Sequence, residues 1–78
     1  MANIDKIEEL QEILKENATD FQTRRQLAIL LLDSGFAQEA LQHFLYLKNI
    51  FKEDSGIYYN LGIVYEKLKQ FPNAEKHI

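Results

Sequence analysis

The sequence predicts an all-α fold built from tandem helix–turn–helix units. Apolar residues recur at spacings of three and four, and no segment shows the period-two alternation of a half-buried strand. The chain also matches itself at an offset of 34 residues, a period typical of helical repeats. Its 78 residues are 46% hydrophobic and include no cysteine, so they suffice for one small core without a disulfide or a thiolate metal site. We therefore expect an α-solenoid of about two units with one helix in front.

Residues 1–20 are predicted to form a leading acidic helix. Six acidic residues and two lysines give this segment a net charge of −4, in a chain whose net charge is −3. Its apolar residues form a single helical stripe: Ile4, Ile7, Leu10, Ile13 and Leu14. This arrangement predicts an outer helix that packs with one side and exposes its charged faces to water.

The second helix is expected to start near Thr19. Thr19 followed by Gln22 has the form of a capping box, and Asp20 is the alternative N-cap. The helix should continue through the apolar run to Asp33 and stop at Gly35, because glycine accepts the left-handed conformation that commonly ends a helix.

Two further helices and the start of a third follow. One is expected from about Gln38 to Lys52, with a turn and cap at residues 54–56 after it, and the next from about Ile57 to Lys69. Pro72 then suits the first turn of a fifth helix, where its missing N–H carries no cost.

The offset of 34 pairs residues of matching size at helix-packing positions. The pairs are Leu27 with Leu61, Ala28 with Gly62, Leu31 with Tyr65, Ala37 with Phe71, Ala40 with Ala74 and Phe44 with Ile78. Only Ala37 with Phe71 differs strongly in size. The small residues are expected where two helices cross at close approach, and the larger ones should fill the space around each crossing.

The second copy resembles a tetratricopeptide repeat. The residues that carry the resemblance are Tyr58, Leu61, Gly62 and Tyr65, followed by Phe71, Pro72 and Ala74. The first copy is more degenerate: it has Leu27, Ala28, Leu31, Gly35, Ala40 and Phe44, but Arg24 where an aromatic residue is expected. The resemblance divides the chain into a leading half-repeat at 1–20, a repeat at 21–54 and a repeat at 55–78 truncated in its second helix.

The leading helix resembles the second helix of a still earlier repeat, with Leu10 and Ile13 at its packing positions. The alternative is an ordinary three- or four-helix bundle whose self-similarity is fortuitous.

The resemblance implies a protein–protein interaction module without catalysis or cofactor, whose partner peptide or helix lies in a groove lined by the first helix of each pair. The residues from Leu27 to Leu32 support this independently, because six consecutive apolar side chains surround a helix and cannot all face one core. Ile29 and Leu32 are expected to leave the core. The candidate partner-binding residues are Gln22, Arg25, Ile29, Leu32, Tyr59, Asn60, Ile63 and Glu66. The alternative is that neighbouring repeats or a partner subunit cover Ile29 and Leu32.

Other chemistries find weaker support. A chaperone-binding branch of the family clamps a terminal carboxylate, and Arg25 and Asn60 match that pattern while Ile29 does not, so a solvated surface is favoured. His43 and His77 recur one repeat apart but lack a third metal ligand, and no catalytic motif occurs. The acidic charge balance argues against nucleic acid, and the longest apolar run is too short for a bilayer. A cytoplasmic protein is expected.

The C-terminal edge is expected to present apolar surface from Tyr58, Tyr65, Phe71 and Ile78, because the sequence supplies neither a capping helix nor a third repeat. A homodimer through this edge, possibly with exchanged helices, would cover it. The alternative function is therefore a structural or self-assembly unit, or a piece of a longer array.

Overall fold

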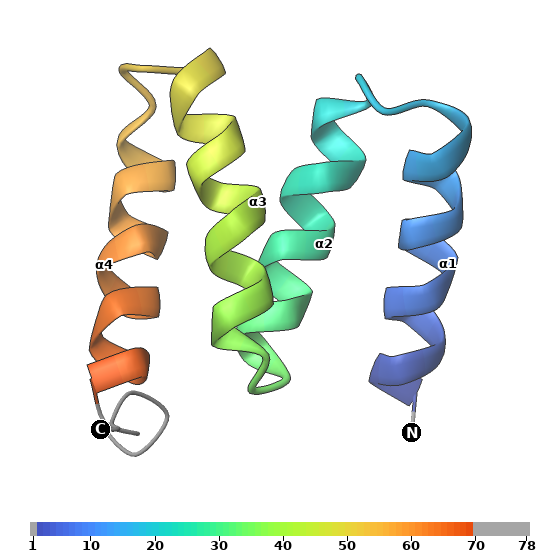
Figure 1. Ribbon diagram of the computed structural model, residues 1–78, viewed down its shortest axis with the longest axis horizontal. Coiled ribbons are helices and arrows are strands. Elements are labelled where there is room, and N and C mark those ends of the chain that lie inside the picture. The colour runs from blue at the N-terminus through green and yellow to red at the C-terminus, as the bar shows by residue number, and fades with distance from the viewer. Residues whose placement is uncertain (1, 70–78) are drawn as a thin grey trace.

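The computed structural model describes residues 2–69 of the chain, which form four helices. They are α1 (Ala2–Glu16), α2 (Phe21–Asp33), α3 (Ala37–Ile50) and α4 (Ser55–Lys69), and this part of the chain contains no strand. The helices lie in a row and each runs antiparallel to the next (Figure 1). The predicted all-α class is confirmed.

Aspartate, not threonine, caps α2. Asp20 Oδ1 accepts a hydrogen bond from the Thr23 N–H at 3.1 Å, and Asp20 Oδ2 accepts one from the Thr23 hydroxyl at 2.8 Å. Thr19 instead donates its hydroxyl to Asn17 Oδ1 at 3.0 Å, so the capping box predicted from Thr19 is wrong and the alternative cap is confirmed. At the other end of α2, Gly35 has φ +92°, the left-handed conformation predicted to end the helix.

The boundaries of α3 and α4 lie within two residues of the predicted ones, whereas α1 ends at Glu16, before the predicted limit of residue 20. Helix α3 begins one residue early at Ala37 and ends at Ile50, while α4 begins at Ser55 and ends at Lys69. The earlier start of α4 follows from Asp54, whose carboxylate accepts hydrogen bonds from the first N–H groups of the helix. The fifth helix predicted from Pro72 lies outside the described residues.

The core contains apolar residues from all four helices. Its members are Ile7, Leu10 and Leu14 of α1, Leu27, Ala28, Leu31 and Leu32 of α2, Ala37, Ala40, Phe44 and Leu47 of α3, and Ile57, Leu61 and Val64 of α4. Ile4 and Ile13 flank the buried face of α1 and remain 43% and 39% exposed. The prediction that Ile13 packs with Leu10 is therefore wrong, because Leu14 takes that place one residue further along the helix.

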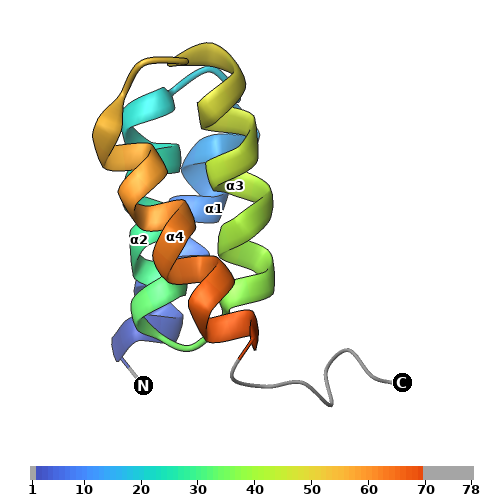
Figure 2. The same cartoon turned by 90° about the vertical axis from the view of Figure 1, so that its left-hand side faces the viewer.

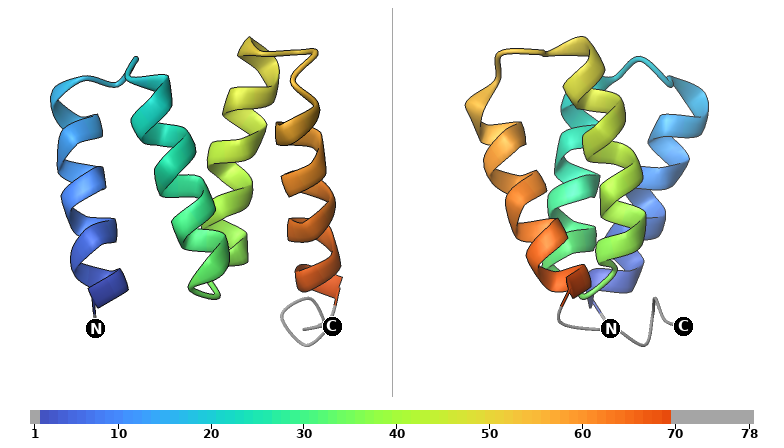
Figure 3. Two further views of the ribbon diagram at one scale, coloured as in Figure 1. Left: turned by 180° about the vertical axis from the view of Figure 1, so that it is seen from behind. Right: turned by 60° about the vertical axis from the view of Figure 1, so that its left-hand side comes forward.

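The row of helices is open. Helix α2 packs against α1 and α3, and α3 packs against α4, whereas α1 and α4 lie at opposite ends (Figure 1). The same order is visible from behind (Figure 3), and the molecule is a slab of 37 × 34 × 18 Å. Seen along the row, α2 and α4 begin on the same side and α3 lies on the other (Figure 2). In a closed four-helix bundle the first and last helices would instead be neighbours.

Only part of the predicted repeat pairing can be followed in residues 2–69. Leu27 and Leu61 are both buried, but Tyr65 is 52% exposed while Leu31 is buried. A Cβ atom added at Gly62 would meet nothing within 4 Å, so the close crossing predicted there is absent from this part of the chain. The segment expected to cross at Gly62 follows Pro72 and lies outside the described residues. The later members of three other pairs, Phe71, Ala74 and Ile78, lie outside them as well.

Each helix of the described region is too short or too polar to span a membrane.

Candidate partner-binding groove

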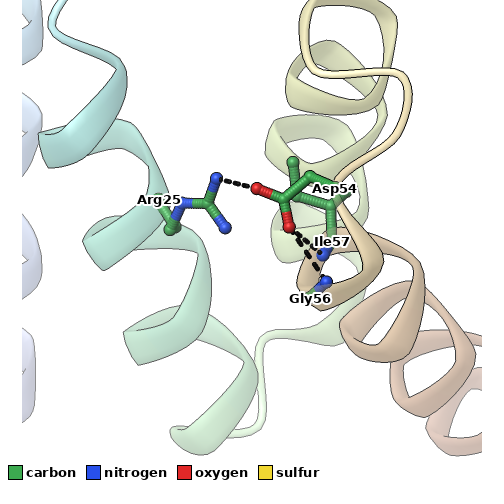
Figure 4. Close-up of polar contacts among 4 residues, drawn as sticks. All are labelled: Arg25, Asp54, Gly56 and Ile57. Carbon is green, nitrogen blue, oxygen red and sulfur yellow. Dashed lines mark hydrogen bonds and ion pairs between the residues drawn. The ribbon is translucent and has the colours of Figure 1, made fainter.

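An ion pair joins α2 to the start of α4. Arg25 Nη2 donates to Asp54 Oδ2 at 2.7 Å, and both side chains are about one-third exposed (Figure 4). The other oxygen, Asp54 Oδ1, accepts from the N–H groups of Gly56 and Ile57 at 2.9 and 3.3 Å. One carboxylate thus caps α4 and binds the guanidinium of α2, which fixes the two helices with their N-termini at the same end.

The electrostatics of this pair change the role expected of Arg25. The hydrogen bond from Arg25 is the main cause that lowers the pKa of Asp54, and partial burial opposes it. Since the guanidinium is already bound to an internal carboxylate, a carboxylate from a partner would have to displace Asp54. Arg25 therefore first holds α2 and α4 together, a role that no local sequence pattern indicates.

A hollow of about 460 Å³ lies beside this pair. Its lining residues are Phe21, Gln22, Arg25, Gln26, Ile29 and Phe51. It brings together three of the candidate residues, and Ile29 is 38% exposed at its edge. Gln26 was missed, although its spacing of four from Gln22 places both amides on one face of the helix. Phe21 and Phe51 were missed as well; their rings meet edge to face with centroids 5.5 Å apart.

A second hollow, of about 510 Å³, lies on α4. Its lining residues are Tyr58, Tyr59, Gly62, Ile63, Glu66 and Lys67. Three more of the candidate residues meet here, and Tyr59 is 71% exposed. The hydroxyl of Tyr58 donates to the carbonyl of Lys52 at 2.7 Å, which fixes one wall of the hollow.

Two candidate residues lie outside both hollows. Leu32 is only 4% exposed and belongs to the core, so the prediction that it leaves the core with Ile29 is wrong. Helix α2 packs against α1 and α3 at once, so its buried face is wide enough to include Leu32 while Leu30 is only partly buried. Asn60 is half-buried and lines neither hollow.

The neighbouring arginine faces the other side of α2. Arg24 stacks over the ring of Tyr46, with Cζ 4.0 Å from the ring centroid, and donates to the Ala18 carbonyl at 3.1 Å. Its Nη1 lies 3.2 Å from His43 Nδ1, and because a guanidinium can only donate, Nδ1 is the acceptor. Burial, followed by the charge of Arg24, lowers the pKa of His43. Arg24 stands where the repeat pattern expects an aromatic residue, and its guanidinium stacks on the aromatic ring of Tyr46.

No three His, Asp or Glu side chains within the described residues gather in a way that could hold a metal ion. His77 lies outside the described part of the chain.

Comparisons with family models, curated proteins and solved structures found no match for the chain.

Proposed function

We propose that the chain is a tetratricopeptide-like interaction module that binds a segment of a partner protein along α2 and α4, without catalysis. The observation that carries the proposal is the gathering of six predicted residues at two hollows on two helices tied by one ion pair. Gln22, Arg25 and Ile29 line the first hollow, and Tyr59, Ile63 and Glu66 line the second. The open row of sequentially packed helices supports a repeat-like arrangement.

The chemistry of this surface suits protein recognition. It combines an exposed tyrosine, two glutamine amides and two isoleucines with few unpaired charges, and aromatic residues are enriched at the centres of protein interfaces. Tyr59 offers a large contact area for little loss of side-chain freedom. We expect it to be the anchor of the interface.

The proposal can be tested by selecting binding peptides from a random twelve-residue display library against the full chain. Binding should perturb the amide signals of Gln22, Ile29 and Tyr59 in a ¹⁵N-labelled sample. Tyr59→Ala should weaken the selected peptides at least about fivefold, the usual cost of truncating an interface anchor. Tyr65→Ala is the matched control, because Tyr65 lies on the same helix, is 52% exposed and lines neither hollow.

Self-assembly is the second candidate function, and the exposed face around Gly62 favours it. Tyr58 and Tyr65 are 47% and 52% exposed, and the space above Gly62 between them is open in the described structure. Large exposed aromatic residues on one helix face commonly mark an interface. Light scattering behind a sizing column distinguishes the two functions: self-assembly predicts a mass above 9.2 kDa that Tyr65→Ser reduces, whereas a monomer unaffected by Tyr65→Ser contradicts it.

A further inference from the structure

The residues that line the hollow on α4 extend along one side of the helix, and we refer to this shallow hollow as the slot. Tyr58 and Tyr59 stand at its N-terminal end and Glu66 at its C-terminal end, seven residues or ~10 Å further along. Gly62 forms the floor, where nothing lies within 4 Å of the position a Cβ would take. Ile63 forms part of the side. The slot is long enough for an extended side chain lying parallel to the helix.

The charge in the slot differs from the charge in the hollow on α2. Arg25 is paired with Asp54 at 2.7 Å, so the first hollow has no unneutralised charge. Glu66 is exposed and forms no ion pair within residues 2–69. Lys67 also lines the slot, but it contributes to a different hollow near Glu39 as well. The carboxylate of Glu66 is therefore available to a cation from the partner, and Lys67 beside it is a like charge that such a cation would meet.

Within residues 2–69, the Tyr59 ring stacks on no other ring and no cation lies over it. Tyr59 is 71% exposed, and the ring contacts and cation contacts of the described region involve other aromatic residues. The same chain already uses such a ring elsewhere, since the Arg24 guanidinium lies 4.0 Å from the centre of the Tyr46 ring. A guanidinium combines stacking on an aromatic face with bidentate binding to a carboxylate.

We infer that the slot receives an arginine side chain from the partner segment. The apolar stem of the arginine lies over Tyr59 and Ile63, and its guanidinium binds Glu66. This inference rests on the proposed interaction function and adds to it the chemistry of the partner, which is basic at the α4 hollow and uncharged at the α2 hollow.

The test uses the peptides selected against the full chain. Each selected peptide that contains arginine is synthesised again with citrulline, which keeps the shape of arginine and removes its charge. The citrulline peptide should bind the wild-type chain about two- to fivefold more weakly, the effect of losing one surface ion pair with Glu66. The same exchange should change binding less than about twofold on Glu66→Gln. Glu12→Gln removes an equal charge from α1 and should behave like the wild type.

The outcomes separate the two proposals. The arginine inference is overturned, and the interaction function left standing, if the peptides that perturb Ile29 and Tyr59 contain no arginine, tolerate citrulline, or bind Glu66→Gln unchanged. Failure to select any peptide that perturbs these residues overturns both. Lys67→Met gives an independent check, because removal of this like charge should strengthen the binding of the arginine peptides and leave the citrulline peptides unchanged.

Discussion

The N-termini of α2 and α4 carry the same cap, and the two caps differ in what the second carboxylate oxygen does. Asp20 and Asp54 are separated by the 34-residue offset that relates the two copies. In both, Oδ1 accepts from the backbone N–H three residues later. Asp20 Oδ2 remains local and accepts from the Thr23 hydroxyl, whereas Asp54 Oδ2 accepts from Arg25 on another helix.

This difference shows how a repeated local motif becomes a tertiary contact. The residue equivalent to Thr23 in the second copy is Ile57, which has no hydroxyl and is fully buried. The second oxygen of Asp54 is consequently available for the guanidinium of Arg25. The first cap thus stabilises one helix, and the second also sets the position of α4 relative to α2.

The largest effect is expected for Asp54→Ala, which removes the α4 cap and the tie to α2 together. We expect a fall in melting temperature of about 5–12 °C, more than a helix cap alone is worth in a domain of this size. Circular dichroism at 222 nm measures it. Asp54→Asn keeps a capping oxygen and should recover part of the loss. A loss equally large in Asp54→Asn would show that the cap contributes little.

Asp20→Ala should have a smaller effect, because it removes only local hydrogen bonds. The expected fall in melting temperature is about 4–8 °C, measured in the same way. If Asp20→Ala destabilised the chain more than Asp54→Ala, the contrast between a local and a tertiary cap would be wrong.

Arg25→Gln tests the tie without disturbing the cap. The expected fall in melting temperature is about 1–4 °C, since a partly exposed ion pair contributes little to stability. Raising the salt concentration should narrow the difference between Arg25→Gln and the wild type, because salt screens partly exposed charges. A difference that does not depend on salt would indicate that Arg25 acts through packing against Phe51, whose ring centre lies 6.0 Å from Cζ.

The smallest and most selective effect is on the acidity of the two caps. The largest cause that lowers the pKa is the Thr23 side chain for Asp20 and the Arg25 side chain for Asp54. NMR titration of the carboxyl carbons should therefore show that Thr23→Val raises the pKa of Asp20 alone and Arg25→Gln raises that of Asp54 alone. A shift of both carboxyls in either variant would contradict the assignment.

The sign of the pH dependence follows from the same pKa values. Both carboxyls are more acidic in the folded chain than in the unfolded chain, so their contribution to stability is complete above the unfolded pKa. It is lost below about pH 4, as the pH falls through the folded pKa. Thr23→Val should reduce the part of this acid-induced loss of stability that comes from Asp20, and Arg25→Gln should reduce the part that comes from Asp54.

Much of the fold could be predicted because its signals are local. The end of α2 at Gly35 and the α2 cap at Asp20, kept open as the alternative to Thr19, depend on residues a few positions apart. Three residues of the apolar stripe predicted in α1, Ile7, Leu10 and Leu14, are buried, whereas Ile4 and Ile13 at its edges are not. The choice between Leu30 and Leu32 in α2 could not be predicted, because six consecutive apolar residues leave the buried face undefined until both neighbouring helices are known.

The candidate site was predictable in composition and less so in contacts. Shifting Arg25, Ile29 and Leu32 by the 34-residue offset gives Tyr59, Ile63 and Glu66, which meet at one hollow. The binding of Arg25 to Asp54 joins residues 29 positions apart, and no local pattern indicates it. The sequence indicated each cap separately, Asp20 as the alternative to Thr19 and a turn and cap at residues 54–56, and the equivalence of Asp20 and Asp54 at the repeat offset was the signal left unused.

The open row of helices has a consequence for the rate at which the chain folds. Since each helix packs on the helix next to it in the sequence, most native contacts close only short loops. Helical proteins with such low contact order fold in microseconds to milliseconds. The ion pair between Arg25 and Asp54 joins residues 29 positions apart, so its formation requires closure of a long loop, and we expect it to form after the main barrier is crossed. Its loss should therefore hasten unfolding and leave the refolding rate nearly unchanged.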